Sequence, residues 1–340
     1  MNDSHTYAEI KSQALAWQNA IDVTWSKATA INAVTGRYNQ VIFTGCGSTY
    51  YLSLAGASLF QKMTGKIARA VPSSELLFNT SAVVDRKIPC LLIAISRSGT
   101  TSETVKAVEK FKDDNLGEVI AVTNYDTALA KLADLALVLP AGQEESVAQT
   151  RSFASMYVAV TAICAIAAGR TDLRAAMNSL PAVGERLMSR YEGLAREIGE
   201  NTAVDRFYFL GSGARYGLAC EVNLKMKEMT LTHSEPFHFH EFRHGPMSMV
   251  GESTVVVGLL SDVNFNQEQM VLDEMGQMGA RILALSESEG NVVFQSGIPE
   301  EVRGVLYLPV LQLMAYYRSM AKGLNPDSPK HLTAVVTLNL

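Results

Sequence analysis

Residues 95–105, ISRSGTTSETV, join the end of an apolar strand directly to the start of a helix through a short turn of small residues. A strand that leads through such a turn into a helix is the building unit of α/β folds. Residues 96–101 are called the anion turn, and four of them carry hydroxyl groups: Ser96, Ser98, Thr100 and Thr101. Because these hydroxyls meet the free N–H groups and the positive dipole end of the helix, we expect the turn to bind a phosphate monoester. An ordinary serine-rich helix cap is the alternative, and this turn alone leaves it open.

A second turn of the same kind lies earlier in the chain, where residues 41–49, VIFTGCGST, also run from a strand into a helix. In an open parallel sheet, ligands bind beyond the carboxyl ends of the strands, where neighbouring strand-to-helix turns meet. We therefore expect this glycine turn, residues 45–49, to line the same pocket through Gly45, Cys46, Gly47, Ser48 and Thr49. Neither turn has the GxxxxGK[ST] pattern of a nucleoside-triphosphate loop.

The hydrophobic pattern predicts two similar halves, each a doubly wound α/β domain with a parallel sheet. In the first half, helical spacing over residues 7–33 precedes short apolar runs that predict strands at residues 41–43, 91–95, 119–123 and 136–139. A weaker copy starts at residue 207, where FYFLGSGARYGLA resembles VIFTGCGSTYYLSLA, and continues with predicted strands at residues 254–260, 281–285 and 305–308. Two long helices are predicted between the halves, at residues 153–168 and 173–198.

The GxG turns of the two halves could instead indicate a dinucleotide-binding enzyme. That fingerprint needs a third glycine, whereas Tyr50 and Tyr216 stand at its place. No acidic residue ends a second strand about 20 residues later, either. The sequence therefore favours an anion site over a nicotinamide site, and no cofactor is expected.

Composition narrows the class of protein further. The chain has 340 residues, of which 48% are hydrophobic, and its net charge of −5 includes no basic stripe, so we expect small-molecule partners and no nucleic acid. The four cysteines have no CxxC or CxxxC spacing, which is typical of reduced thiols. The sequence shows neither an apolar secretory segment nor a run of about 18 apolar residues, so a cytoplasmic protein without a membrane partner is expected.

Residues 219–250 hold the densest group of reactive side chains in the second half. Glu221, Lys225 and Glu228 stand at helical spacing, so one helix face would present a carboxylate, an ammonium and a second carboxylate. A surface ion pair worth about 0.3–0.5 kcal/mol is the simpler explanation. The flanking residues are apolar, however, and a partly buried carboxylate on such a helix suits proton transfer.

Three histidines follow within eight residues: His238, His240 and His244. They lack the HExxH spacing and a cysteine partner, so no metal is expected. His244 differs from the other two because it immediately precedes a Gly-Pro bend, from which a side chain can project into a site.

Six motifs in order along the chain carry a resemblance to a known family: GCGSTY at 45–50, SRSGTTSET at 96–104, ESVAQTRSF at 145–153, EVNLKMKE at 221–228, EFRHGP at 241–246 and PKHLTAVVT at 329–337. With these motifs the chain resembles the double sugar-isomerase-domain (SIS) proteins. It is most similar to the isomerase half of glucosamine-6-phosphate synthase and to stand-alone glucosamine-6-phosphate deaminases and phosphosugar isomerases. The resemblance covers nearly the whole chain from about residue 20. It implies two flavodoxin-like SIS subdomains related by a pseudo-twofold repeat.

The resemblance also implies a role for each matching position. The 6-phosphate would be held by Ser96, Arg97, Ser98 and Thr101. Ser48 and Thr49 would complete the pocket, and Val147 and Gln149 would face the sugar chain. Glu228 would move a proton between C1 and C2 of the sugar, with Glu221 and Lys225 supporting its helix. His244 would assist ring opening and would reach the site from the neighbouring subunit of a homodimer.

Four segments are predicted on the same basis: an N-terminal helical segment (1–35), a first SIS domain (36–170), a bridging helix (171–200) and a second SIS domain (201–340) whose C-terminal tail would close the site. Arg97 would add a fixed cation to an otherwise neutral set of donors.

Two departures separate the chain from the synthase. The lysine that attacks the ketose in the synthase falls at Ala334. No glutaminase domain with a nucleophilic cysteine at position 2 is expected ahead of the fold, since the second residue is Asn2. We therefore expect conversion of glucosamine 6-phosphate to fructose 6-phosphate and ammonia. An isomerase of a hexose 6-phosphate or 6-sulfo sugar without nitrogen chemistry is one alternative. A sugar-phosphate-sensing regulator is another, although only about 40 residues, not basic in character, precede the first predicted strand where a DNA-binding module would need ~60.

Overall fold

The computed structural model describes residues 4–333, 335 and 338, and the chain forms two compact units. The N-terminal sheet unit consists of Ser12–Glu144, Gln149–Pro181 and Thr333–Leu340. The C-terminal sheet unit consists of Met1–Lys11, Glu145–Ala148 and Ala182–Leu332. The first helix and a four-residue segment from the middle of the chain thus belong to the C-terminal sheet unit.

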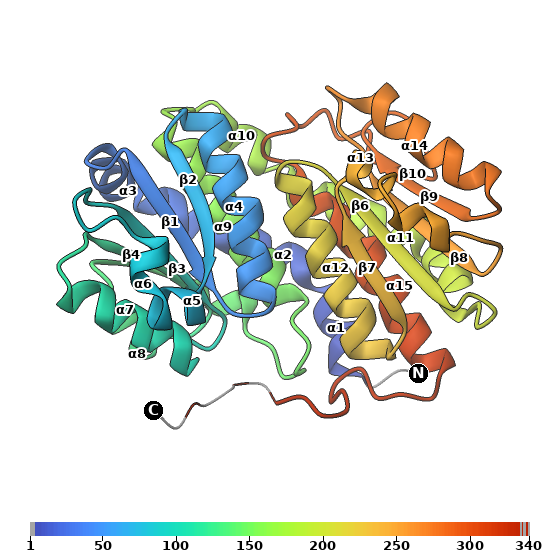
Figure 1. The fold of residues 1–340 in the computed structure, drawn as a ribbon, viewed down its shortest axis with the longest axis horizontal. Coiled ribbons are helices and arrows are strands. Elements are labelled where there is room, and N and C mark those ends of the chain that lie inside the picture. The colour runs from blue at the N-terminus through green and yellow to red at the C-terminus, as the bar shows by residue number, and fades with distance from the viewer. Residues whose placement is uncertain (1–3, 334, 336–337, 339–340) are drawn as a thin grey trace. The chain divides into compact units, whose positions relative to one another are not determined.

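The N-terminal sheet unit contains α2 (Gln13–Ser26), α3 (Ala28–Gly36), β1 (Gln40–Gly45), α4 (Ser48–Thr64), β2 (Ile67–Pro72), α5 (Ser73–Phe78), α6 (Thr80–Val83), β3 (Leu91–Ser96), α7 (Ser102–Asp113), β4 (Val119–Thr123), α8 (Ala128–Leu132), β5 (Leu135–Val138), η1 (Pro140–Gly142), α9 (Arg151–Ala167) and α10 (Leu173–Met177). Its five strands are parallel and lie in the order β2-β1-β3-β4-β5 (Figure 1). This is the flavodoxin-like order, in which the direction of winding reverses between β1 and β3.

Apolar side chains cover both faces of this sheet, as expected for parallel strands between two helical layers. On one face, Ile42 and Leu92 belong to a buried cluster with Phe111 of α7. On the other face, Phe43 packs edge-on against Phe60 of α4, with ring centroids 5.9 Å apart. The carboxyl ends of β1 and β3 are thereby fixed between the helices that follow them.

The C-terminal sheet unit contains α1 (His5–Lys11), most of α11 (Leu180–Glu200), β6 (Arg206–Gly211), α12 (Ala214–Thr230), β7 (His233–Phe237), α13 (Phe239–Phe242), η2 (Pro246–Met249), β8 (Thr254–Leu259), α14 (Phe265–Gln277), β9 (Arg281–Ser286), β10 (Val292–Val293), η3 (Gly304–Tyr307) and α15 (Leu308–Ala321). Its parallel strands lie in the order β10-β9-β8-β6-β7, which repeats the strand order of the first sheet. The prediction of two doubly wound α/β halves is confirmed.

The turn after the first strand of each sheet has the same backbone shape. Gly47 and Gly213 each stand immediately before a helix and have a positive φ. The angles are φ 55° and ψ −124° at Gly47, and φ 59° and ψ −133° at Gly213. A Cβ atom on Gly45 or Gly211 would lie within 2.7 Å of the backbone of the helix residue four positions later. Only glycine fits these positions, so the two halves share one turn geometry.

Three details of the predicted elements are wrong. Residues 305–308 form no strand; they lie in η3 and at the start of α15, where Pro309 suits the first helical turn because it has no N–H group. The helix predicted at 173–198 is two helices, α10 and α11. The edge strands β2, β7 and β10 were not predicted, because β2 and β7 have no continuous apolar run and β10 is only two residues long.

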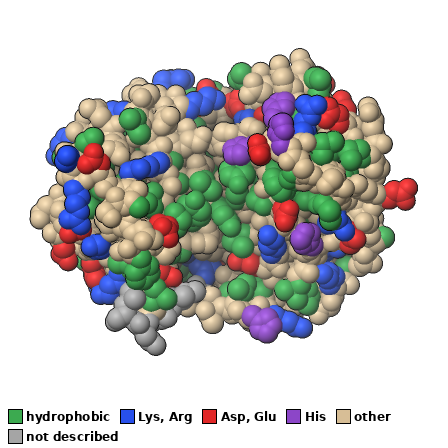
Figure 2. Space-filling model, viewed as in Figure 1, with side chains coloured by type: hydrophobic (Ala, Val, Ile, Leu, Met, Phe, Trp, Pro, Cys, Tyr) green, Lys and Arg blue, Asp and Glu red, His purple; other side chains and the backbone are tan. Residues whose placement is uncertain are grey.

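Charged side chains of both signs are interspersed over the face of the protein shown in Figure 2. Among the described residues, no helix combines the length and the apolar character needed to cross a bilayer.

Candidate functional site

The anion turn follows β3 in the N-terminal sheet unit and is shaped by its own hydroxyl groups. The Ser96 hydroxyl accepts a hydrogen bond from the Gly99 N–H at 3.1 Å and lies 3.2 Å from the Thr101 hydroxyl. The Ser98 hydroxyl accepts hydrogen bonds from the N–H and the hydroxyl of Thr100, at 3.1 and 3.0 Å. Thr101 precedes α7 but makes no side-chain hydrogen bond to cap that helix. An ordinary capping role therefore does not account for this hydroxyl group.

The glycine turn lies close to the anion turn within the same unit. The Thr49 hydroxyl accepts a hydrogen bond from the Cys46 N–H at 2.9 Å and donates one to the Cys46 carbonyl at 2.9 Å. The Cys46 sulfur lies 3.6 Å from the hydroxyl of Thr104, which is in α7 directly after the anion turn. Burial raises the pKa of Cys46, so its thiol is neutral near pH 7. The structure thus brings the two predicted turns to the start of one helix.

Arg97 does not act as an isolated cation in the anion turn. Its side chain is 8% exposed, and a guanidinium nitrogen lies 3.7 Å from a carboxylate oxygen of Glu144, which is fully buried. Glu144 also accepts hydrogen bonds from the N–H groups of Thr150 and Ser152 at the start of α9, at 2.8 and 3.0 Å. The expected positive charge is therefore partly balanced within the unit.

Glu144 is a residue that the sequence interpretation missed. It immediately precedes the motif at 145–153, and this position next to a family motif is the signal that could have identified it.

Of the two residues expected to face the sugar chain, Val147 belongs to the C-terminal sheet unit and Gln149 to the N-terminal sheet unit. The Val147 N–H donates a hydrogen bond to the Asp327 carbonyl at 2.9 Å. The side-chain oxygen of Gln149 is buried and has no hydrogen-bond partner among the described residues. A buried polar atom without a protein partner is unusual, so the Gln149 amide is suited to contact a ligand.

The predicted Glu-Lys-Glu face of α12 exists and is largely buried in the C-terminal sheet unit. The Lys225 ammonium lies 3.4 Å from a carboxylate oxygen of Glu221 and 2.5 Å from one of Glu228. The exposed fractions of the three side chains are 1% for Glu221, 2% for Lys225 and 19% for Glu228. A surface ion pair is therefore the wrong description. Glu228 is the member of the three that solvent, and hence a ligand, can reach.

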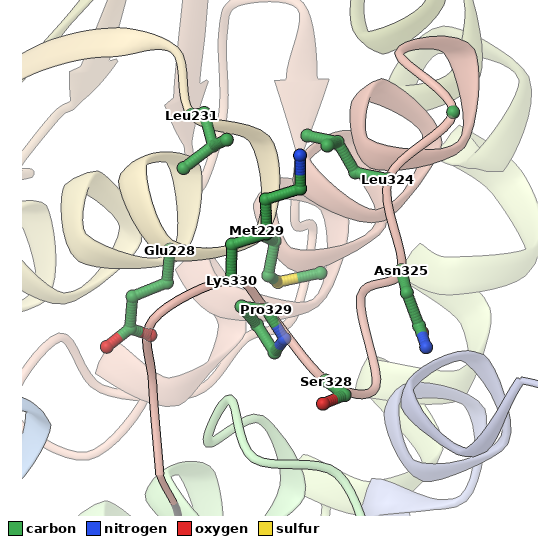
Figure 3. A pocket seen from close by; sticks show the side chains of 9 residues that line it. Glu228, Met229, Leu231, Leu324, Asn325, Ser328, Pro329 and Lys330 are labelled. Atoms are coloured by element: carbon green, nitrogen blue, oxygen red, sulfur yellow. The ribbon is translucent and has the colours of Figure 1, made fainter.

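A cavity of about 310 Å³ adjoins this helix within the same unit (Figure 3). Glu228, Met229 and Leu231 contribute from the end of α12 and the residue that follows it. The opposite wall is formed by residues after α15: Gly323, Leu324, Asn325, Ser328, Pro329 and Lys330. The cavity brings polar and apolar side chains beside the accessible carboxylate.

His244 lies in the C-terminal sheet unit, in the turn after α13. Its N–H donates a hydrogen bond to the Glu241 carbonyl, and its side chain is exposed. Gly245 has φ 121°, a conformation that favours glycine and makes the bend. His238, in contrast, stacks on Tyr216 with ring centroids 3.9 Å apart, which gives it a packing role.

Ala334, where the synthase has its lysine, lies outside the described residues, and so does Asn2. One described residue near the C-terminus, Leu338, lies beside the anion turn. Its N–H donates a hydrogen bond to the Ser102 hydroxyl at 3.2 Å. Together with Thr100 and Lys106 it lines a cavity of about 200 Å³.

Comparison with known proteins identifies relatives over nearly the whole chain. The SIS domain family matches residues 37–166 and 202–317. A glutamine–fructose-6-phosphate aminotransferase (isomerizing) from Pyrococcus horikoshii is 30% identical over 97% of this chain and 57% of its own length. The chain thus spans little more than half the length of such curated relatives.

Two solved structures are similar over nearly their full length. Glucosamine-6-phosphate deaminase from Thermotoga maritima is 26% identical, with a TM-score of 0.84 over 98% of this chain and 100% of that protein. Tagatose-6-phosphate ketose/aldose isomerase from Escherichia coli has a TM-score of 0.87 at 24% identity, with 96% of each chain covered, which shows the shared fold.

Proposed function

Because the chain belongs to the SIS domain family, we propose that it is an enzyme that isomerises a 6-phosphosugar, and that glucosamine 6-phosphate is converted to fructose 6-phosphate and ammonia. The observation that carries the proposal is the buried Glu221, Lys225 and Glu228 face of α12, with one carboxylate accessible. A protein that only bound a phosphosugar would need the anion turn but no buried group for proton transfer. The similarity to the Thermotoga maritima deaminase over its full length supports the deamination.

The anion turn would hold the 6-phosphate through the hydroxyls of Ser96, Ser98 and Thr101 and through Arg97. Hydrogen bonds to a charged group are worth about 1.5–3 kcal/mol each, so this turn would supply much of the binding energy. Ser48 of the glycine turn would complete the pocket. No metal or cofactor enters the proposed reaction.

Chemistry would begin with the open-chain aldose, whose formation His244 assists. Glu228 takes the proton from C2, and the electron pair of that C–H bond forms a C1–C2 double bond as the C1 oxygen gains a proton. Return of a proton to C1, with loss of a proton from the amino nitrogen, leaves an imine at C2. Water adds to the imine carbon and ammonia leaves, which gives fructose 6-phosphate. Lys225 holds the Glu228 carboxylate in place at 2.5 Å during both proton transfers.

A panel of substrates tests the proposal. The purified chain is incubated with glucosamine 6-phosphate, galactosamine 6-phosphate, glucose 6-phosphate and a 6-sulfo hexose, and ketose and ammonia are assayed separately. Ketose and ammonia in equal amounts from glucosamine 6-phosphate are expected. Ketose without ammonia from another sugar would make the chain a plain isomerase. Binding without turnover of any sugar would favour the sensing regulator.

A further inference from the structure

Asp327, in the segment after α15, holds the start of α1 through its carboxylate. Three residues of the N-terminal segment donate four hydrogen bonds to it: the Ser4 hydroxyl at 2.7 Å, the His5 N–H at 3.0 Å, and the N–H and hydroxyl of Thr6 at 2.8 and 2.7 Å. Thr6 is fully buried. A carboxylate at this place satisfies N–H groups that have no partner within the helix. Residues more than 320 positions apart are therefore tied together.

The same region holds the segment that contains Val147. The Asp327 carbonyl accepts the Val147 N–H at 2.9 Å. From α1, the carboxylate of Glu9, which is 4% exposed, accepts the N–H groups of Glu145 and Ser146 at 2.6 and 3.3 Å, and the hydroxyl of Ser146. The segment is thus fixed by α1 on one side and by Asp327 on the other.

Asp327 also adjoins the wall of the Glu228 cavity. Ser328, Pro329 and Lys330 follow it directly in the chain and line that cavity, as does Asn325 (Figure 3). One residue therefore connects three parts of the C-terminal sheet unit: the first helix, the cavity wall and the segment with Val147.

We propose that Asp327 is a positioning residue for the sugar site. Through its hydrogen bonds to α1, Asp327 holds the wall of the Glu228 cavity and the Val147 segment in place. This rests on the proposed function, in which Glu228 transfers the proton and Val147 faces the sugar chain. The first helix is then part of the scaffold of the site and not an appendage of the fold. Phosphate binding by the anion turn, which lies in the other unit, does not depend on this anchor.

Kinetics of the full chain test the proposal with three substitutions. Asp327→Ala removes all four acceptor contacts, and Asp327→Asn keeps an oxygen that can accept some of them. Asp273→Asn is the control, because Asp273 is an exposed residue of α14 in the same unit. We expect Asp327→Ala to lower kcat/KM for glucosamine 6-phosphate by roughly tenfold or more, with partial recovery in Asp327→Asn and no change in the control. Competitive inhibition by inorganic phosphate should stay within about twofold.

Amide hydrogen exchange supplies a readout that needs no catalysis. In Asp327→Ala, exchange at residues 145–148 and 4–9 should increase relative to the sheet strands of the same unit. If the wild-type chain turns over no sugar phosphate, the proposed function fails while this measurement still decides whether the anchor exists. A lower Tm with kcat/KM unchanged would overturn the positioning role, and so would an equal loss of phosphate inhibition or unchanged exchange in these segments.

Discussion

At the scale of single residues, the two carboxylates that contact Lys225 differ in accessibility, and this difference supports the proposal that Glu228 is the group that exchanges protons. Glu221 is enclosed, whereas 19% of the Glu228 side chain is exposed beside a cavity. Glu228→Gln keeps the size and polarity of the side chain but cannot accept a proton. We expect turnover to fall by ~10²–10⁴ while substrate affinity changes only a fewfold.

Solvent exchange measures this prediction directly. In heavy water, the wild type should place deuterium at C1 or C2 of the recovered sugar, and Glu228→Gln should not. Glu252→Gln serves as a matched control, since Glu252 is exposed and lies outside the cavity. Deuterium incorporation by Glu228→Gln at the wild-type rate would assign the proton transfer to another residue.

Ser98 carries a second prediction at this scale. Its oxygen already accepts hydrogen bonds from Thr100, so the hydrogen of its hydroxyl can be donated to a bound anion. Ser98→Ala should weaken binding of a sugar-6-phosphate analogue by roughly tenfold or more, as one hydrogen bond to a charged group is worth about 1.5–3 kcal/mol. Titration calorimetry measures the change, with the exposed Ser26→Ala as control. Equal affinity in both variants would remove Ser98 from the site.

At the scale of elements, Glu192 of α11 links two other helices of the C-terminal sheet unit. It accepts hydrogen bonds from Tyr7 of α1 and Tyr317 of α15, and its carboxylate lies 2.9 Å from the Lys11 ammonium. Burial alone would raise the pKa of Glu192, but hydrogen bonds from the two tyrosines and the lysine outweigh burial and lower it to about 2. Above pH ~4.5, the ordinary value, these contacts stabilise the folded state fully, and the contribution is lost as the pH falls through about 2.

Glu192→Gln should therefore lower the free energy of unfolding at pH 7 by about 1–3 kcal/mol, and the difference from wild type should shrink as the pH is lowered from 4.5 to the acid limit of folding. Urea unfolding at pH 7, 4.5 and 3.5 measures it. Glu197→Gln is the control, because Glu197 forms an exposed ion pair with Arg281 that is worth at most about 1 kcal/mol. If the difference in unfolding free energy between Glu192→Gln and wild type were constant from pH 7 to 3.5, Glu192 would not have the lowered pKa described above.

The elements that the sequence predicted best are the central strands. The predicted strands at residues 91–95 and 119–123 agree with β3 and β4 to within a residue, because a strand covered on both faces needs an unbroken apolar run. The edge strands β2 and β7 escaped prediction because they bury only part of their surface, as in HSEPF of β7, whereas the more apolar edge strand β5 was predicted. The run at 305–308 was misassigned because a helix that is buried on all sides, such as α15, is as apolar as a buried strand.

The candidate site, too, could be predicted from the sequence only in part. Residues in motifs, such as Glu228 and the anion turn, were identified from spacing and resemblance, and their roles stay predictions. Glu144 and Asp327 were missed because the residues that they contact are distant in sequence. Glu144 pairs with Arg97, and Asp327 accepts hydrogen bonds from the start of α1, which contains no recognisable motif. Only the folded chain shows which carboxylate accepts which hydrogen bond.

At the scale of the whole molecule, we propose that the working form is a homodimer with shared sites. His244 is exposed in the C-terminal sheet unit, at a glycine bend that leaves its side chain accessible to a second chain. If each site takes Glu228 from one subunit and His244 from the other, a heterodimer of inactive Glu228→Gln with inactive His244→Ala has one intact site of its two. An equal mixture should therefore recover about a quarter of the wild-type activity through subunit exchange. Activity is assayed after co-incubation, and light scattering gives the mass.

Mixing Glu228→Gln with the double variant Glu228→Gln/His244→Ala is the control, because no heterodimer then holds an intact carboxylate. A fully active monomer would contradict the shared site.

The matching turns at Gly47 and Gly213 show that the backbone path of a turn does not fix the side chains it carries. The glycines set the backbone path in both repeats, whereas hydroxyl groups occupy the first repeat and Arg215, paired with Glu268 at 3.0 Å, occupies the second. The same backbone turn thus carries hydroxyl groups in one repeat and an internal ion pair in the other. In protein design, the side chains of the second turn could therefore be substituted to make a new binding site, provided that Gly211 and Gly213 are kept.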